Sequence, residues 1–240
     1  MNATTPTVVL VHGAFAESSS WNSVIAELRR RGYPVLAVAN PLRGLRDDAT
    51  YLRSVLDSQT GPVVLAGHSY GGTVLSEAAE GAANVRALVY IASFQLEVGE
   101  STGELAAKYP GAQLGAALEP VPYPRPDGTE GSDLYIKQDQ FPAVFAADVD
   151  KETAALMAAT QRPIEAQALA DTATRAAWRT IPSWSLITLQ DLAIPADSMR
   201  FMAERAGSTA VEINASHAVT VSQPGPVADL IHQAATAITE

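Results

Sequence analysis

Cysteine is absent from this chain of 240 residues. A disulfide framework, a thiolate metal site and a thiol nucleophile are therefore excluded. Basic residues are also scarce, because 16 Lys and Arg stand against 26 Asp and Glu, which gives a formal net charge of −10. A phosphate backbone would be repelled by such a chain, so we expect no nucleic-acid partner.

Long apolar runs are missing as well. No uninterrupted stretch approaches the roughly 18–20 apolar residues that a membrane-spanning helix needs, and no membrane partner is expected. The first six residues do not place an apolar stretch after a basic one, so no signal peptide is expected either. With 47% hydrophobic and 18% charged residues, the composition predicts one soluble domain with a substantial core, in the cytoplasm. The oligomeric state is left open, and a homodimer is one alternative.

Short β-branched segments alternate with longer amphipathic ones through most of the chain. This alternation predicts an α/β protein with a doubly wound, mostly parallel sheet, because parallel strands are joined by helical crossovers. Strand patterns occur at 7–11, 34–39, 62–66, 85–91, 183–189 and 209–213. Helical patterns occur from about 18 to 32 and at 46–58, 72–83, 195–206 and 225–238.

One long segment interrupts this rhythm. Between Phe94 and Pro182 no convincing buried strand is visible, and a turn-rich stretch at 119–128 is accompanied by Ala-rich helical runs around 132–147, 150–160 and 163–171. Connections of this length in compact domains are usually functional. We therefore expect an α/β core made of 1–94 and 181–240, and an inserted, mainly helical cap at 95–180.

The strongest motif is Gly67-His68-Ser69-Tyr70-Gly71-Gly72, between an apolar strand and a helical run. A nucleophile elbow needs this context, because a sharp strand-to-helix turn lifts the serine hydroxyl above the sheet. The positions two before and two after the serine must be small, and both are glycine. Ser69 is therefore the candidate nucleophile; the alternative is a glycine-rich turn whose serine only caps the helix.

A serine nucleophile needs a base to take its proton. Of the four histidines, His12 ends the first strand, His68 lies inside the elbow and His232 falls in the last helix. His217 follows the last strand, at the sheet edge where doubly wound proteins place their sites. His217 is therefore the candidate base.

A carboxylate should orient that base. Asp191 directly follows the strand at 183–189 and is our candidate. Asp197 competes, but a position just after Pro195 at the start of a helix is ordinary for a capping carboxylate. The chain order Ser69, Asp191, His217 is that expected for nucleophile-elbow enzymes.

Acyl transfer also requires donors for the oxyanion. The backbone amide of Tyr70, which directly follows the nucleophile, is one candidate. The second should come from the loop after the first strand, at Ala14. Both groups belong to the backbone, so the side chains at these positions carry little information.

Together, five features of the chain resemble the α/β-hydrolase superfamily. They are H-G-A-F at 12–15, the G-H-S-Y-G-G elbow, the cap segment, Q-D-x-x-I-P at 190–195 and S-H-A-V at 216–219. The chain is most similar to the small esterases related to plant methylesterases and hydroxynitrile lyases, and to their bacterial relatives. The resemblance implies a triad of Ser69, Asp191 and His217 with oxyanion amides at Ala14 and Tyr70. Superfamily members often begin with further strands, so we expect a trimmed sheet of about six.

The leading hypothesis is a serine carboxylesterase that acts on small-molecule esters without a metal or organic cofactor. A C–C lyase is one alternative, but the hydroxynitrile lyases typically carry Lys after the histidine and often Glu two residues before the serine, where this chain has Ala218 and Gly67. A small-molecule receptor with a vestigial triad is another. Phe15, Tyr123 and Phe145 are candidate substrate contacts, although aromatic residues of this kind more often serve core packing. The sequence does not identify the preferred ester.

Overall fold

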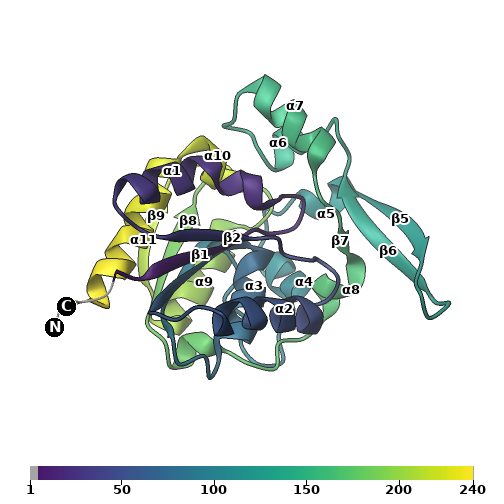
Figure 1. Ribbon diagram of the computed structural model, residues 1–240. Coiled ribbons are helices and arrows are strands. Elements are labelled where there is room, and N and C mark those ends of the chain that lie inside the picture. Colours follow the sequence, from purple (N-terminus) through teal and green to yellow (C-terminus); the bar gives the residue numbers. More distant parts are fainter. Residues whose placement is uncertain (1–4, 240) are drawn as a thin grey trace.

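The computed structural model describes residues 5–239, and its centre is a parallel sheet (Figure 1). Within this range the sheet has six strands: β1 (Thr7–Val11), β2 (Val35–Val38), β3 (Val63–Ser69), β4 (Val85–Ser93), β8 (Ser183–Thr188) and β9 (Thr209–Ile213). Their order is β2-β1-β3-β4-β8-β9, and every neighbouring pair is parallel. The predicted α/β class and the sheet of about six strands are confirmed. Residues 1–4, which belong to the stretch inspected for a signal peptide, lie outside the described residues.

Helices cover both faces of this sheet (Figure 1). The helices of the core are η1 (Ser18–Trp21), α1 (Asn22–Arg30), α2 (Leu45–Asp57), α3 (Tyr70–Ala79), α9 (Ala196–Ala206), α10 (Val219–Ser222) and α11 (Pro224–Ala237). Helices α1 and α11 pack together on one face, and α2 and α3 pack together on the other. Strand β3 is consequently buried along its whole length, which explains why its sequence is an apolar run rather than an alternating one. Among residues 5–239, no helix combines the length and the apolar character that crossing a bilayer demands.

The segment between β4 and β8 contains strands as well as helices. Its elements are α4 (Thr102–Ala107), α5 (Leu114–Ala117), β5 (Leu118–Pro124), β6 (Glu130–Ile136), α6 (Phe141–Val144), α7 (Lys151–Thr160), β7 (Ile164–Glu165), α8 (Ala166–Ala170) and η2 (Ala177–Arg179). Strands β5, β6 and β7 form a separate antiparallel sheet, so the expectation of a mainly helical cap was incomplete. Of the helix expected at 132–147, only 141–144 is helical, and 132–136 is strand. Strand β5 is largely exposed, β6 is mostly half-buried, and only the two-residue β7 is fully buried, so this sheet lacks the long buried apolar runs that mark the core strands. That this segment is a cap with boundaries at 95 and 180 stays a prediction, and the word cap is used below only for the residues between β4 and β8.

The β5–β6 hairpin extends away from the core (Figure 1). Its edge strand β5 carries Pro120, Pro122 and Pro124 at alternate positions. Because N–H groups of a strand point alternately to its two sides, these prolines remove donors from one side only. Strand β5 can therefore pair with β6, while its outer edge lacks the N–H donors that a further strand would need.

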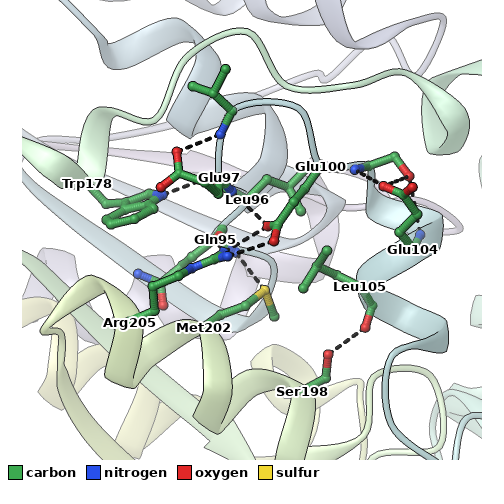
Figure 2. A network of polar contacts seen from close by, with 12 residues as sticks. Gln95, Leu96, Glu97, Glu100, Glu104, Leu105, Trp178, Ser198, Met202 and Arg205 are labelled. Carbon is green, nitrogen blue, oxygen red and sulfur yellow. Dashed lines mark hydrogen bonds and ion pairs between the residues drawn. The ribbon is translucent and has the colours of Figure 1, made fainter.

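A polar network attaches the start of the cap to the core (Figure 2). The Arg205 guanidinium on α9 donates to both oxygens of Glu100, at 2.7 and 2.9 Å, and to the carbonyl of Gln95 at 2.9 Å. The indole N–H of Trp178 donates to the Leu96 carbonyl at 2.8 Å. The start of the cap, directly after β4, is thus held by α9 of the core and by η2 at the end of the same inserted segment.

Helix α4 is fixed next along the chain. Ser101 and Glu104 form a capping box, in which the serine side chain accepts from the Glu104 N–H and the glutamate accepts from the Ser101 N–H. The Ser198 hydroxyl on α9 donates to the Leu105 carbonyl at 2.5 Å (Figure 2). These contacts hold Thr102 and its neighbours at the site described below.

Glu100→Gln should lower the free energy of unfolding by about 1–2 kcal/mol at pH 7, because it removes the charge that Arg205 pairs with. Burial raises the pKa of Glu100, but the hydrogen bonds and charge of Arg205 outweigh it and hold the pKa below the ordinary value of 4.5. A carboxylate with a lowered pKa stabilises the fold above its unfolded pKa and loses this effect as the pH falls through its folded pKa.

Urea unfolding at several pH values gives the difference in the free energy of unfolding between the parent and Glu100→Gln. This difference should be constant from pH 7 to 5 and should shrink below the ordinary pKa of 4.5. Glu204→Gln removes the same charge from an exposed position of α9 and is the matched control. Equal stabilities for Glu100→Gln and the parent at pH 7 would contradict the prediction.

Candidate active site

The elbow between β3 and α3 holds Ser69 in a left-handed backbone conformation, with φ 54° and ψ −127°. Space at this turn is minimal. A Cβ on Gly67 would lie 2.6 Å from the backbone of Gly71, and one on Gly71 would lie 2.4 Å from the Val11 carbonyl oxygen. The Ser93 hydroxyl on β4 donates to the Ser69 carbonyl at 2.6 Å, which satisfies a buried acceptor created by the sharp turn.

Asp191 follows β8 in a loop that satisfies both of its carboxylate oxygens. Oδ1 accepts the N–H groups of Ala193 and Ile194, each at 2.8 Å. Oδ2 accepts the Thr188 hydroxyl at 2.8 Å and Nδ1 of His217 at 2.7 Å. Burial alone would raise the pKa of Asp191, but His217 and the hydrogen-bond donors outweigh it and hold the pKa below its ordinary value. The carboxylate is therefore ionised at neutral pH and fixes the proton of His217 on Nδ1.

The His217 ring is buried next to the elbow. Its centroid lies 4.7 Å from that of His68, the residue before Ser69. Nε2 of His68 donates to the His217 carbonyl at 2.8 Å, so the elbow also holds the backbone of the His217 loop. Burial is the main cause that lowers the pKa of His68 to about 3, and the nearby His217 lowers it further. His68 is therefore neutral at physiological pH. The role of His68 as a support of this loop was missed, because nothing local predicts a contact across 149 residues of sequence.

The loop after β1 is built around a second neutral histidine. Nδ1 of His12 donates to the Gly13 carbonyl at 2.9 Å, and Nε2 accepts the Asn40 N–H at 3.0 Å. Burial lowers the pKa of His12 to about 4. A Cβ on Gly13 would lie 2.6 Å from Cβ of Ser69, so the loop carrying Ala14 is in direct contact with the elbow.

A narrow cavity of about 60 Å³ lies at Ser69. It is lined by Ala14, Phe15, Ser69, Tyr70, Phe94, Thr102, Gly103, Ala106, Leu114, Leu169, Ala193 and Ile194. One apolar space is thus lined by Ser69 of the elbow, by Ala14 and Tyr70, which are expected to supply oxyanion amides, and by Ala193 and Ile194, whose N–H groups donate to Asp191. The cap contributes the opposite wall through α4, α5 and α8.

The three aromatic residues expected to contact a substrate occupy different places. Phe15 lines the cavity, with φ +60° in the loop after β1. Tyr123 lies on β5, with its ring 5.8 Å from the Arg43 guanidinium, and is not part of the cavity lining. Phe145 is also absent from the lining and packs edge-on against His217, with 4.8 Å between the ring centroids.

Tyr70 has a side-chain partner that the sequence did not reveal. Its hydroxyl donates to Oδ2 of Asp48 at 2.9 Å, and Oδ1 of Asp48 accepts the Arg43 N–H at 3.0 Å. Burial raises the pKa of Asp48 and also that of Tyr70. In the sequence, Asp48 looks like an ordinary acid in the first turn of a helix; the fold instead buries it behind the cavity wall.

Asp197 lies apart from the site. It occupies the first turn of α9, is mostly exposed and pairs with Arg200 at 2.8 Å. The expected capping role was wrong in detail, because the N-cap position belongs to Pro195 and no side chain caps this helix.

The fold and the strained serine turn beside a buried His–Asp pair are those of a nucleophile-elbow hydrolase. The family model described as "Alpha/beta hydrolase family" matches residues 8–230, and the chain belongs to this family. The predicted superfamily is thereby confirmed.

Several characterised proteins are similar to the chain. An alpha/beta hydrolase of Aspergillus novofumigatus, nvfD, is 28% identical over 255 residues, which cover 96% of each chain. A carbendazim hydrolyzing esterase of a Nocardioides strain is 34% identical over 113 residues, which cover 42% of this chain and 47% of the esterase. The crystal structure of polyneuridine aldehyde esterase superposes with a TM-score of 0.83 at 22% identity, covering 96% of this chain and 99% of that one.

The two neutral histidines predict acid sensitivity. The pKa values of His12 and His68 are lowered to about 4 and about 3 from an ordinary 6.5, so between pH 6.5 and 5 both imidazoles take up protons in the unfolded chain but stay neutral in the folded protein. Well above pH 6.5 both histidines are neutral in the folded and the unfolded protein, and their titration does not affect stability. As the pH falls below 6.5, only the unfolded chain takes up these protons, and the free energy of unfolding decreases. Between pH 6.5 and 5 the free energy of unfolding should fall by about 3 kcal/mol, roughly half from each histidine.

Urea unfolding across this range measures the loss. His68→Gln should halve it, because the amide can still donate to the His217 carbonyl but does not titrate. His232→Gln removes an exposed histidine and should leave the loss unchanged. A flat stability profile between pH 6.5 and 5 would contradict the prediction.

Proposed function

We propose that the protein is a serine carboxylesterase that cleaves esters of small molecules through an acyl-enzyme. The observation that carries the proposal is the buried Asp191–His217 hydrogen bond of 2.7 Å beside the strained Ser69 turn, at the end of an apolar cavity. An ionised carboxylate behind a histidine is the arrangement that converts a serine hydroxyl into a nucleophile.

The reaction runs in two halves. The Ser69 hydroxyl adds to the ester carbonyl while Nε2 of His217 takes its proton, and Asp191 stabilises the resulting imidazolium. The tetrahedral intermediate expels the alcohol, which receives the proton from His217. Water then attacks the acyl-enzyme with His217 again as base, releasing the carboxylic acid and restoring Ser69.

The oxyanion of each intermediate is bound by the backbone N–H groups of Ala14 and Tyr70. Both residues line the cavity together with Ser69. Tyr70 is the first residue of α3, so its N–H is one of those that a helix cannot satisfy internally, and the helix dipole favours negative charge there. No metal or organic cofactor takes part.

Ester hydrolysis is supported by similarity as well as by geometry. The Nocardioides relative is named an esterase, and so is polyneuridine aldehyde esterase, whose fold is similar. Ala218 after the histidine favours hydrolysis over cyanohydrin cleavage, because it offers no cation to a departing cyanide. The apolar lining of the cavity indicates an uncharged acyl or alcohol group, and the location in the cytoplasm remains a prediction.

Ser69→Ala and His217→Ala should each lower kcat by about 10⁴–10⁶, and the double variant should be hardly worse than either, because neither group works without the other. Asp191→Asn should cost less than loss of Ser69, since the imidazole survives without its orienting partner. Steady-state hydrolysis of a short p-nitrophenyl ester measures these effects, and circular dichroism verifies folding.

Asp197→Asn is the matched control, because it removes an exposed carboxylate from the start of α9, and it should keep kcat nearly intact. Full activity of Ser69→Ala would refute the mechanism. Full activity of Asp191→Asn with an inactive Asp197→Asn would refute the choice of acid. A parent protein that binds esters without turnover would instead indicate the receptor function.

The cavity itself can be tested with Ala106→Phe. Ala106 lines the cavity from α4, and a larger side chain there should fill a space of only about 60 Å³. We expect kcat/KM for p-nitrophenyl butyrate to fall roughly 10-fold or more, with a smaller loss for the acetate. Equal losses for both esters would show that this cavity does not receive the acyl chain.

A further inference from the structure

The loop that carries His217 is held by the cap as well as by the core. On one side of His217, the Ala218 N–H donates to the Phe145 carbonyl at 2.9 Å. On the other side, the Ser216 hydroxyl donates to the Asp148 carboxylate, with the Phe145 carbonyl at 3.3 Å as a second acceptor. Both neighbours of the histidine are therefore bound by one short cap segment, 145–148, which directly follows α6.

The same segment also contacts the imidazole. The Phe145 side chain is buried, and its ring meets that of His217 at 77° with 4.8 Å between the centroids. Since the His68 ring lies 4.7 Å from His217, the imidazole has an aromatic ring from the elbow and another from the cap as neighbours. The Phe145 ring is itself supported by Phe141, at 4.9 Å.

A general base must aim one nitrogen at the nucleophile. The hydrogen bond to Asp191 fixes Nδ1 of His217, but one hydrogen bond still lets the imidazole tilt about that contact. Contacts against the ring and to both neighbouring residues remove this freedom. A misplacement of about 1 Å caused by a residue away from the chemistry can cost roughly 10²-fold in rate.

We propose that Phe145 and Asp148 of the cap are positioning residues for His217, so that the cap completes the geometry of the general base in addition to walling the cavity. This inference rests on the proposed serine esterase function. It assigns Phe145 a place behind the catalytic base instead of a contact with the substrate.

Phe141 provides a matched control for Phe145. Both phenylalanines are buried, they lie four residues apart, and they pack on one another. The ring contact with His217 belongs to Phe145. Replacing either by Leu removes an aromatic ring from the same cluster, so a general loss of packing should be similar in the two variants.

Phe145→Leu should lower kcat about 10- to 100-fold with KM for p-nitrophenyl acetate changed less than about twofold, because the base is misaligned, whereas Phe145 itself does not line the cavity and meets the lining residue Phe15 edge-on, with 6.4 Å between the ring centroids. Phe141→Leu should lower kcat by less than about threefold at a similar loss of stability. Equal kcat losses for the two variants, or a Phe145→Leu effect confined to KM, would overturn the positioning role.

The polar contact is tested by a second set of variants. Asp148→Ala should lower kcat about 3- to 10-fold, and Asp148→Asn should restore most of it, because the amide oxygen can still accept from Ser216. Asp139→Ala removes the same charge from an exposed position of the cap and should retain the parent kcat. A kcat of Asp148→Ala equal to that of Asp139→Ala would show that the Ser216 contact positions nothing.

A spectroscopic readout separates this inference from the proposed function. The low-field proton NMR resonance of His217 Nδ1–H reports the hydrogen bond to Asp191 without any turnover. Phe145→Leu and Asp148→Ala should shift or broaden it, whereas Phe141→Leu and Asp139→Ala should leave it as in the parent. An inactive parent with these changes refutes the esterase but supports the positioning role; an active parent with an unchanged resonance in all variants refutes the positioning role alone.

Discussion

The site depends on one steric constraint, the contact between the end of β1, the elbow and the start of α3. A Cβ at Gly71 would lie 2.4 Å from the Val11 carbonyl oxygen, and one at Gly13 would lie 2.6 Å from Cβ of Ser69. With no room for side chains, the loop carrying Ala14 lies directly against the Ser69 turn. The strained Ser69 conformation persists because the chain around it is over-determined, by this contact and by the Ser93 hydroxyl on its carbonyl.

Near this point both carboxylate oxygens of Asp191 have hydrogen-bond donors, whereas Nδ1 of His68 and Oδ1 of Asn40 are buried without a hydrogen-bond partner among the described residues. Asp191 is ionised in a water-poor setting because three protein donors accompany His217. His12 and His68 are buried without a carboxylate, and they are neutral for that reason. The low polarity around Asp191 strengthens the effect of its charge on His217.

The cap is attached to this centre at several independent places. Arg205 fixes the entry of the cap through Glu100, and Arg43 joins the hairpin to the core through Asp133 at 2.8 Å. The segment after α6 reaches the His217 loop, and α4, α5 and α8 wall the cavity. A cap bound in this way joins the walls of the cavity and the support of the His217 loop in one structural unit.

The sequence alone determined the sheet and the local chemistry of the site. Apolar β-branched runs such as Val63–Ala66 predict buried strands because their burial on both faces leaves a local pattern, and the glycines around Ser69 predict the elbow because its crowding is local too. Strand ends also suggested Asp191 and His217, which the structure joins by a 2.7 Å hydrogen bond.

Only the tertiary structure decided what distant segments do to one another. In the β5–β6 hairpin, β5 is largely exposed and β6 only partly buried, and backbone pairing holds the two together, so their side chains carry no clear periodic signal. Three contacts join residues more than 20 positions apart: the hydrogen bond between Asp48 and the Tyr70 hydroxyl, that between His68 and the His217 carbonyl, and the ring contact of Phe145 with His217. Such contacts depend on how the helices and the cap pack over the sheet, and packing of that kind leaves no mark on the local sequence.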